Sequence, residues 1–186
     1  LPTVGGAELL LDGLADSLTA RGHSVTVWAP KIRHKDNRMK TRYRLCRYPR
    51  PLSKRFGVRQ TIPFLIWEYL RRGIDILHCH GAYPAAYVGA GVKKILNIPM
   101  IVRPHGADIL PGEWIRRDAR LEKRMILSLN SADRVVAQGQ CLASEIVSLG
   151  IPPDRVEIIH NGVRRLPILP QRVVEGSEPP YLFSMG

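Results

Sequence analysis

A histidine, a glycine and an aspartate follow a short apolar run in the middle of the chain. The run covers residues 98–102, and His105, Gly106 and Asp108 come after Pro104. In open α/β sheets, ligands bind at the carboxyl ends of the strands. A histidine in that place can donate a hydrogen bond to a hydroxyl group or to charge that develops during a reaction. We therefore predict that this segment lines a binding or catalytic cleft.

Glycines stand at corresponding places near the two ends of the sequence. Gly5 and Gly6 precede an amphipathic stretch, and Asn161 and Gly162 follow an apolar one. Glycine allows positive φ angles and close approach of the backbone to a ligand, and N–H groups at a helix start attract anions. The first pair therefore predicts either an anion-binding turn or a tight turn without a ligand. The second pair is a turn signal.

His78 and His80 are the residues that most suggest a metal site. In a strand they would share one face and could reach the same ion. A third and a fourth ligand at suitable spacing do not occur in the sequence. We therefore predict no metal, and we place His80 at the end of its strand with Cys79 packed in the core.

The elements that position these residues alternate along the chain. Periodicity and turn signals predict helices over residues 6–21, 61–72, 83–95, 116–130 and 140–149, and strands over 24–29, 43–48, 74–79, 100–104, 134–137 and 156–160. Repeated strand–helix units with short links indicate an α/β fold with a Rossmann-like, doubly wound parallel sheet. A helix over 116–130 would place several basic residues on one face, namely Arg116, Arg117, Arg120, Lys123 and Arg124.

The two ends of the sequence suggest one domain of a larger protein. The first predicted helix has no strand before it, although that strand is central in a doubly wound sheet. Residues 166–180 contain four prolines and read as a linker, and residues 181–186 begin a new apolar strand. We expect a domain over residues 1–165 that lacks its first strand, followed by the linker and the start of a second domain.

Composition limits the class of protein. The chain has 186 residues, of which 45% are hydrophobic, enough for a sizeable core. No apolar run reaches the roughly 18–20 residues that span a bilayer. Cys46, Cys79 and Cys141 are odd in number and widely spaced, which indicates reduced thiols and a cytoplasmic location.

The net charge of +12 is concentrated in one segment, which we call the basic segment. Residues 31–59 contain twelve lysines and arginines and one acid, Asp36, so they hold +11 of that charge. Such a concentration indicates lipid headgroups, a phosphorylated substrate or nucleic acid as partner, or else a well-solvated loop. Few aromatic residues interleave it, which makes nucleic acid the weaker choice. An anionic membrane surface would contact Arg42, Arg44, Arg47, Arg50, Lys54 and Arg55.

The order of these motifs resembles a known family. Along the chain come the Gly5-Gly6 loop with Glu8, the strand that ends near His80, the segment around His105, and Asn161-Gly162 before a proline-rich stretch. This order is similar to the N-terminal domain of the retaining, nucleotide-sugar-dependent glycosyltransferases of the GT-B fold, the family 4-like group. The resemblance implies that the chain is one of the two Rossmann-like domains of that fold.

The resemblance also implies roles for individual residues. His105 matches the histidine that lines the catalytic cleft beside the transferred sugar, so it is the candidate catalytic residue. The candidate substrate-binding residues are Gly5, Gly6, His80, Arg103, Gly106, Asp108, Asn161 and Gly162. Arg103 replaces the small hydroxyl residue that is common there, and it could meet an acceptor phosphate or be an ordinary surface arginine.

The partners implied by the family are a nucleotide-sugar donor, bound mainly by the C-terminal domain, and a lipid-linked or saccharide acceptor. No metal or other cofactor is required. The family's donor site uses two glutamates separated by seven residues, and no such pair occurs here. The resemblance therefore implies that this chain binds the acceptor and is inactive alone. The competing hypothesis is a basic α/β module that binds an anion or nucleic acid without catalysis.

Overall fold

The computed structural model describes residues 5–31, 41–48 and 58–162 as an alternation of strands and helices. In chain order these are α1 (Gly6–Ala20), β1 (Thr26–Pro30), β2 (Arg44–Tyr48), a 3-10 turn (Val58–Thr61), α2 (Ile62–Arg72), β3 (Leu77–His80), α3 (Ala85–Leu96), β4 (Met100–Arg103), α4 (Ala119–Ser131), β5 (Arg134–Ala137), α5 (Gln140–Ser148), a second 3-10 turn (Pro153–Arg155) and β6 (Val156–Ile158). The predicted linker and second domain lie outside the described residues.

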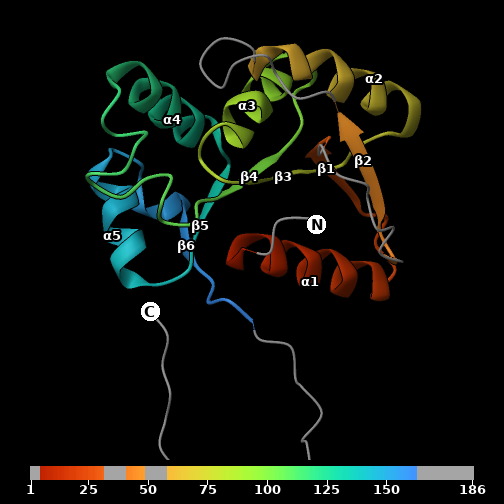
Figure 1. Cartoon of the computed structure of the whole chain (residues 1–186), viewed down its shortest axis with the longest axis horizontal. Helices are drawn as coiled ribbons and strands as arrows, with labels where there is room; N and C mark the ends of the chain where they lie inside the picture. The colour runs from red at the N-terminus through yellow and green to blue at the C-terminus, as the bar shows by residue number, and fades with distance from the viewer. Residues whose placement is uncertain (1–4, 32–40, 49–57, 163–186) are drawn as a thin grey trace, which may run out of the picture.

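The strands form two parallel sheets. One pairs β1 with β2, and the other has the order β3-β4-β5-β6. Every described pairing is parallel, with His80 opposite Arg103 in the second sheet. Figure 1 shows α1 on one side of the strands and α2, α3 and α4 on the other. The expected α/β fold with parallel strands is confirmed, because every described pairing is parallel and a helix separates consecutive strands of the four-stranded sheet.

A hydrophobic core lies between the four-stranded sheet and the helices that cover it. Its fully buried members include Met100 and Val102 of β4, Met125 of α4 and Ile146 of α5. A smaller cluster of Ala15, Val27 and Tyr43 joins α1 to the two-stranded sheet. No described helix has the length and apolarity to cross a membrane.

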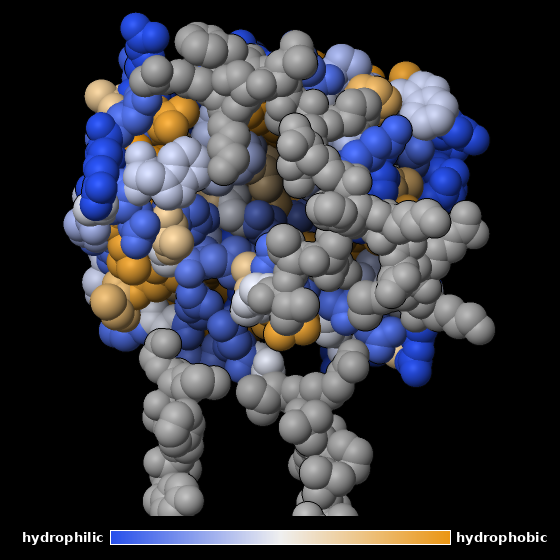
Figure 2. Space-filling view, in the orientation of Figure 1, coloured by the Kyte–Doolittle hydropathy of each residue, from blue (hydrophilic) through white to orange (hydrophobic). Residues whose placement is uncertain are grey.

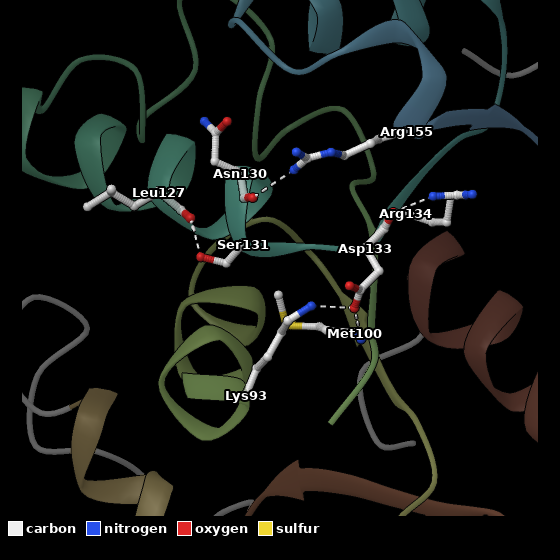
Figure 3. Close-up of polar contacts among 8 residues, drawn as sticks. All are labelled: Lys93, Met100, Leu127, Asn130, Ser131, Asp133, Arg134 and Arg155. Carbon is white, nitrogen blue, oxygen red and sulfur yellow. Dashed lines mark hydrogen bonds and ion pairs between the residues drawn. The ribbon is translucent and has the colours of Figure 1, made fainter. Parts of the chain in front are cut away.

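An ion pair fixes the amino-terminal end of the four-stranded sheet. Asp133, just before β5, accepts hydrogen bonds from Lys93 of α3 and from the backbone N–H of Met100 at the start of β4 (Figure 3). The hydrogen bond from Lys93 and then that from Met100 lower the pKa of this carboxyl. Asp133 therefore sets the positions of a helix and two strands at the end opposite the predicted cleft.

The helix expected over residues 116–130 begins later than predicted. Asp118 is its N-cap and accepts hydrogen bonds from the backbone N–H groups of Arg120 and Leu121, so α4 starts at Ala119. Arg116 precedes the helix and forms ion pairs with Glu122 and Glu145, at 2.6 and 2.7 Å. The prediction that Arg116 and Arg117 share a basic helix face with the later arginines is therefore wrong.

Candidate functional site

The carboxyl ends of neighbouring strands bring most of the predicted site residues together. β3 ends at His80 and β4 at Arg103, while Asn161 follows β6 after two further residues. The loop after β4 contains His105 and Asp108, and Asp108 accepts the backbone N–H of Ala82 just after β3. Arg103, at the end of β4, donates a hydrogen bond to the backbone oxygen of Ile159 just after β6. The site thus lies where parallel α/β sheets place their ligands.

Three imidazole rings form the centre of this site. The ring centroids of His80 and His105 are 5.4 Å apart and the rings are stacked, and the His78 ring lies 4.5 Å from that of His80. His78 and His80 share one face of β3, as expected, and Cys79 between them is buried. Within the part of the chain that the structure describes, no group of three or more histidines, cysteines and acids is arranged to hold a metal.

The environment keeps His80 and His105 uncharged. Burial, followed by the charges of His78, His105 and Arg103, lowers the pKa of His80 to about 3. Burial also lowers the pKa of His105 from its ordinary 6.5, although the carboxylates of Asp108 and Glu8 act in the opposite direction. A neutral imidazole has one N–H donor and one acceptor nitrogen, which match the donor and acceptor of an alcohol.

Several buried nitrogens in this cluster have no hydrogen-bond partner among the described residues. They are Nδ1 and Nε2 of His80, Nε2 of His105 and Nε of Arg103. Buried polar groups are normally paired, and each exception needs a physical explanation. All four atoms belong to the same strand-end cluster, which makes this cluster the candidate site.

Asp108 connects the loop after β3 to the loop after β4. One carboxylate oxygen accepts the backbone N–H of His105 at 2.8 Å, and the other accepts that of Ala82 at 2.5 Å. Gly81 and Gly106 beside these contacts have φ values of 105° and 99°, a conformation that glycine adopts without strain. Asp108 therefore positions His105, and its predicted contact with substrate stays a prediction.

Arg103 is not the ordinary surface arginine that the sequence allowed. It is buried and bonded to residues that follow β6. Its side chain is 6% exposed, and its guanidinium donates to the backbone oxygen of Ile159 at 3.0 Å and to Oδ1 of Asn161 at 2.7 Å. Asn161 in turn donates to Oε1 of Gln138 at 2.8 Å. Burial of a charged group is tolerated when it is hydrogen-bonded in this way. Sequence reasoning missed Gln138, whose only signal is its place directly after a predicted strand.

Gly5 and Gly6 lie at the start of α1, as predicted, and neither uses the positive φ that glycine permits. Gly5 is the N-cap with an extended φ of −114°, and Gly6 is the first helical residue. A Cβ atom added to Gly5 would meet the Glu8 carboxylate, whereas one added to Gly6 would meet nothing. Glu8 affects the pKa of His105, so the start of α1 is electrostatically linked to the histidine cluster. Their predicted contact with a ligand stays a prediction.

Three described arginines of the basic segment, Arg42, Arg44 and Arg47, lie on or beside β2. Arg42 forms an ion pair with Asp16 at 3.6 Å with two thirds (67%) of its side chain exposed, and Arg44 is exposed. Arg47 donates to the backbone oxygen of Pro30 at 3.3 Å. Arg50, Lys54 and Arg55 lie outside the described residues, so the predicted membrane contact stays a prediction.

The low pKa of His80 predicts a specific loss of stability in acid. The unfolded chain binds a proton at this histidine below its ordinary pKa of 6.5, whereas the folded chain does so only near 3. The free energy of unfolding therefore keeps its full value, as far as His80 is concerned, above pH 6.5. It decreases as the pH falls from 6.5 toward 3, because only the unfolded chain then binds the proton. Within this window His80 should contribute a slope of up to about 1.4 kcal/mol per pH unit to the free energy of unfolding.

Urea unfolding over that pH window checks this expectation. The His80→Gln variant should lose this part of the pH dependence, whereas His23→Gln, in an exposed turn, should keep it. An unchanged slope in His80→Gln would show that this imidazole is not held neutral in the folded chain.

The fold is that of a Rossmann-like domain with a candidate site at its strand ends, and comparisons identify its family. The model of Glycosyltransferase Family 4 matches residues 4–165. An uncharacterized glycosyltransferase of Methanocaldococcus jannaschii, MJ1607, is 24% identical over 168 residues, which is 86% of this chain and 43% of that protein. A second from the same organism, MJ1178, is 27% identical over 93 residues, 50% of this chain and 25% of that protein. This chain belongs to Glycosyltransferase Family 4.

Solved structures share the fold. The crystal structure of Anabaena Alr3699/HepE with UDP has a TM-score of 0.65 and 19% identity, and covers 88% of this chain and 42% of that one. The same protein with UDP-glucose gives a TM-score of 0.64 with the same coverage. The chain thus spans less than half the length of the curated relatives and of the solved structure that it matches.

Proposed function

We propose that the full-length protein transfers a hexosyl group from a nucleotide-sugar to a lipid-linked or saccharide acceptor, with retention of anomeric configuration. In this proposal the described domain binds mainly the acceptor, a second domain binds the donor, and no metal takes part. The protein would act in the cytoplasm, at the inner face of the membrane when its acceptor is a lipid. The main support is the cluster of buried imidazole nitrogens without partners, in a chain of Glycosyltransferase Family 4.

The transfer would proceed by exchange of two bonds at the anomeric carbon. The acceptor oxygen forms a bond to this carbon while the bond to the diphosphate oxygen breaks, and the nucleoside diphosphate leaves. The acceptor's proton passes to the departing phosphate. His105, held neutral and positioned by Asp108, would accept a hydrogen bond from a hydroxyl of the transferred sugar. This bond would strengthen as the sugar ring gains positive charge in the transition state, because the hydroxyl then becomes a stronger donor.

His80 would complete the acceptor side of the cleft. With neither ring nitrogen partnered, it can donate one hydrogen bond and accept another from the same or neighbouring hydroxyl groups. Its low pKa means that it stays uncharged in neutral solution, so it favours alcohols over anions. Arg103 would act indirectly, because its guanidinium is bonded to Ile159 and Asn161.

A transfer assay on the full-length protein tests this function. UDP-glucose is the first donor to try, because the similar Anabaena Alr3699/HepE structure was solved with it. We expect a glycosylated product whose anomeric proton shows the donor's configuration by NMR, and no product from residues 1–186 alone. An inverted product would overturn retention. Turnover by residues 1–186 alone would overturn the division of labour, and binding of anions without transfer by the full-length protein would favour the non-catalytic hypothesis.

A further inference from the structure

Helix α2 presents an apolar face to solvent. Phe64, Trp67 and Leu70 are 42%, 51% and 73% exposed. Their spacing of three residues places them along one side of the helix. The opposite side packs on the core through Ile62, Leu65 and Tyr69. Figure 2 shows apolar and pale residues beside strongly hydrophilic ones at the upper right, where α2 lies.

Positive charge borders this apolar face. The Arg71 guanidinium lies over the Trp67 ring, 4.5 Å from its centroid. Arg72 forms an ion pair with Glu68 at 2.9 Å, so the acid on this helix is already neutralised. Arg59, exposed in the 3-10 turn before α2, lies over the Tyr87 ring at 5.2 Å and is the last residue of the basic segment.

We propose that the outward face of α2 binds an anionic lipid surface, with Phe64, Trp67 and Leu70 inserted among the headgroups. The helix lies flat on the membrane, since its 11 residues are too short to cross one. The inference rests on the proposed function in one respect, because it names the element that brings the cleft to a lipid-linked acceptor.

Charge and residue type favour a lipid surface over a protein partner. Tryptophan with an adjacent arginine suits the membrane interface. There the ring contacts the apolar lipid chains and the guanidinium contacts the charged headgroups. A second copy of this chain would also have a net charge of +12, so the two basic surfaces would repel each other. An anionic membrane instead attracts each arginine near its surface.

Tryptophan fluorescence locates the contact. The chain contains three tryptophans, of which Trp67 and Trp114 are 51% and 44% exposed. Trp67 is the one on the outward face of α2, between the exposed Phe64 and Leu70. On phosphatidylcholine vesicles that contain phosphatidylglycerol and brominated lipid, we expect emission to shift to shorter wavelength and to be quenched. The Trp67→Phe variant should lose both signals. Quenching that persists in Trp67→Phe would overturn the proposal.

A binding titration compares two matched triple variants. Serine at Phe64, Trp67 and Leu70 should weaken binding to these vesicles by roughly tenfold or more, because the inserted apolar area is lost. Serine at Leu9, Leu127 and Val147, exposed residues of α1, α4 and α5, should leave binding unchanged. Equal binding by the two triple variants would overturn the proposal. If the unchanged chain is a dimer and the α2 variant is a monomer that still binds vesicles, the face binds a second copy of the chain, which would also overturn the proposal.

Salt separates insertion from simple attraction by charge. Serine at Arg42, Arg44, Arg47 and Arg50 should remove the part of binding that falls with added salt, whereas the α2 variant should remove the part that persists. Binding that vanishes completely at high salt in the unchanged chain would overturn insertion. Since no donor or acceptor is present, these results do not depend on glycosyl transfer, and failure of the transfer assay would leave them standing.

Discussion

The His105→Ala variant of the full-length protein is expected to lower kcat by roughly 100-fold, the order of magnitude lost when one preorganised hydrogen-bonding group is removed from an active site. The imidazole is stacked on His80, its backbone N–H is bonded to Asp108, and its Nε2 has no partner among the described residues. It is therefore positioned before the substrate binds. The measurement is steady-state transfer from the nucleotide-sugar.

The effect should fall mainly on kcat, with KM little changed, because the bond strengthens in the transition state. His78→Ala is the matched control, since its ring belongs to the same cluster but none of its nitrogens is buried without a partner. A normal kcat in His105→Ala would exclude this histidine from the chemistry. Thermal unfolding of both variants shows whether either one has lost stability instead.

Asp108→Ala is expected to lower the free energy of unfolding by roughly 3 kcal/mol, because each hydrogen bond to a charged group contributes about 1.5–3 kcal/mol. The carboxylate accepts the N–H groups of His105 and Ala82, from loops that follow two different strands. Both N–H groups lose this partner when the side chain is removed. Urea denaturation of residues 1–186 measures the change.

Two further variants distinguish this role from general loss of charge. Asp108→Asn keeps one acceptor oxygen and should be about half as destabilising. Asp75→Ala, in an exposed turn between α2 and β3, should have little effect. Equal stability of Asp108→Ala and Asp75→Ala would mean that the two loops are held by other contacts.

Patterns within a single element were enough to predict much of the fold. The strand expected over residues 134–137 has these bounds in the structure, and His80 ends its strand with Cys79 buried beside it. Alternation of apolar and polar residues determines which side of a strand is buried, and this depends only on neighbouring residues. The class of fold followed because a helix between consecutive strands provides the crossover that parallel pairing needs.

What the sequence did not predict depends on contacts between distant residues. Arg103 bonds to Ile159 and Asn161, more than 50 positions away, and nothing near Arg103 in the chain signals its burial. Arg116 likewise pairs with Glu145 of α5 in place of joining a helix face. The stacking of His80 on His105 likewise joins the end of one strand to the loop after another, and no pattern within a single element predicted this geometry.

The bonds of Arg103 make the site mechanically dependent on the chain that leaves the sheet after β6. Arg103 lies two residues before His105, and it is tied to residues 159 and 161. A displacement of residues 159–161 would therefore move the end of β4, and with it the loop that contains His105. The dependence is reciprocal: a molecule that fixes His105 also fixes the direction in which the chain continues past Asn161.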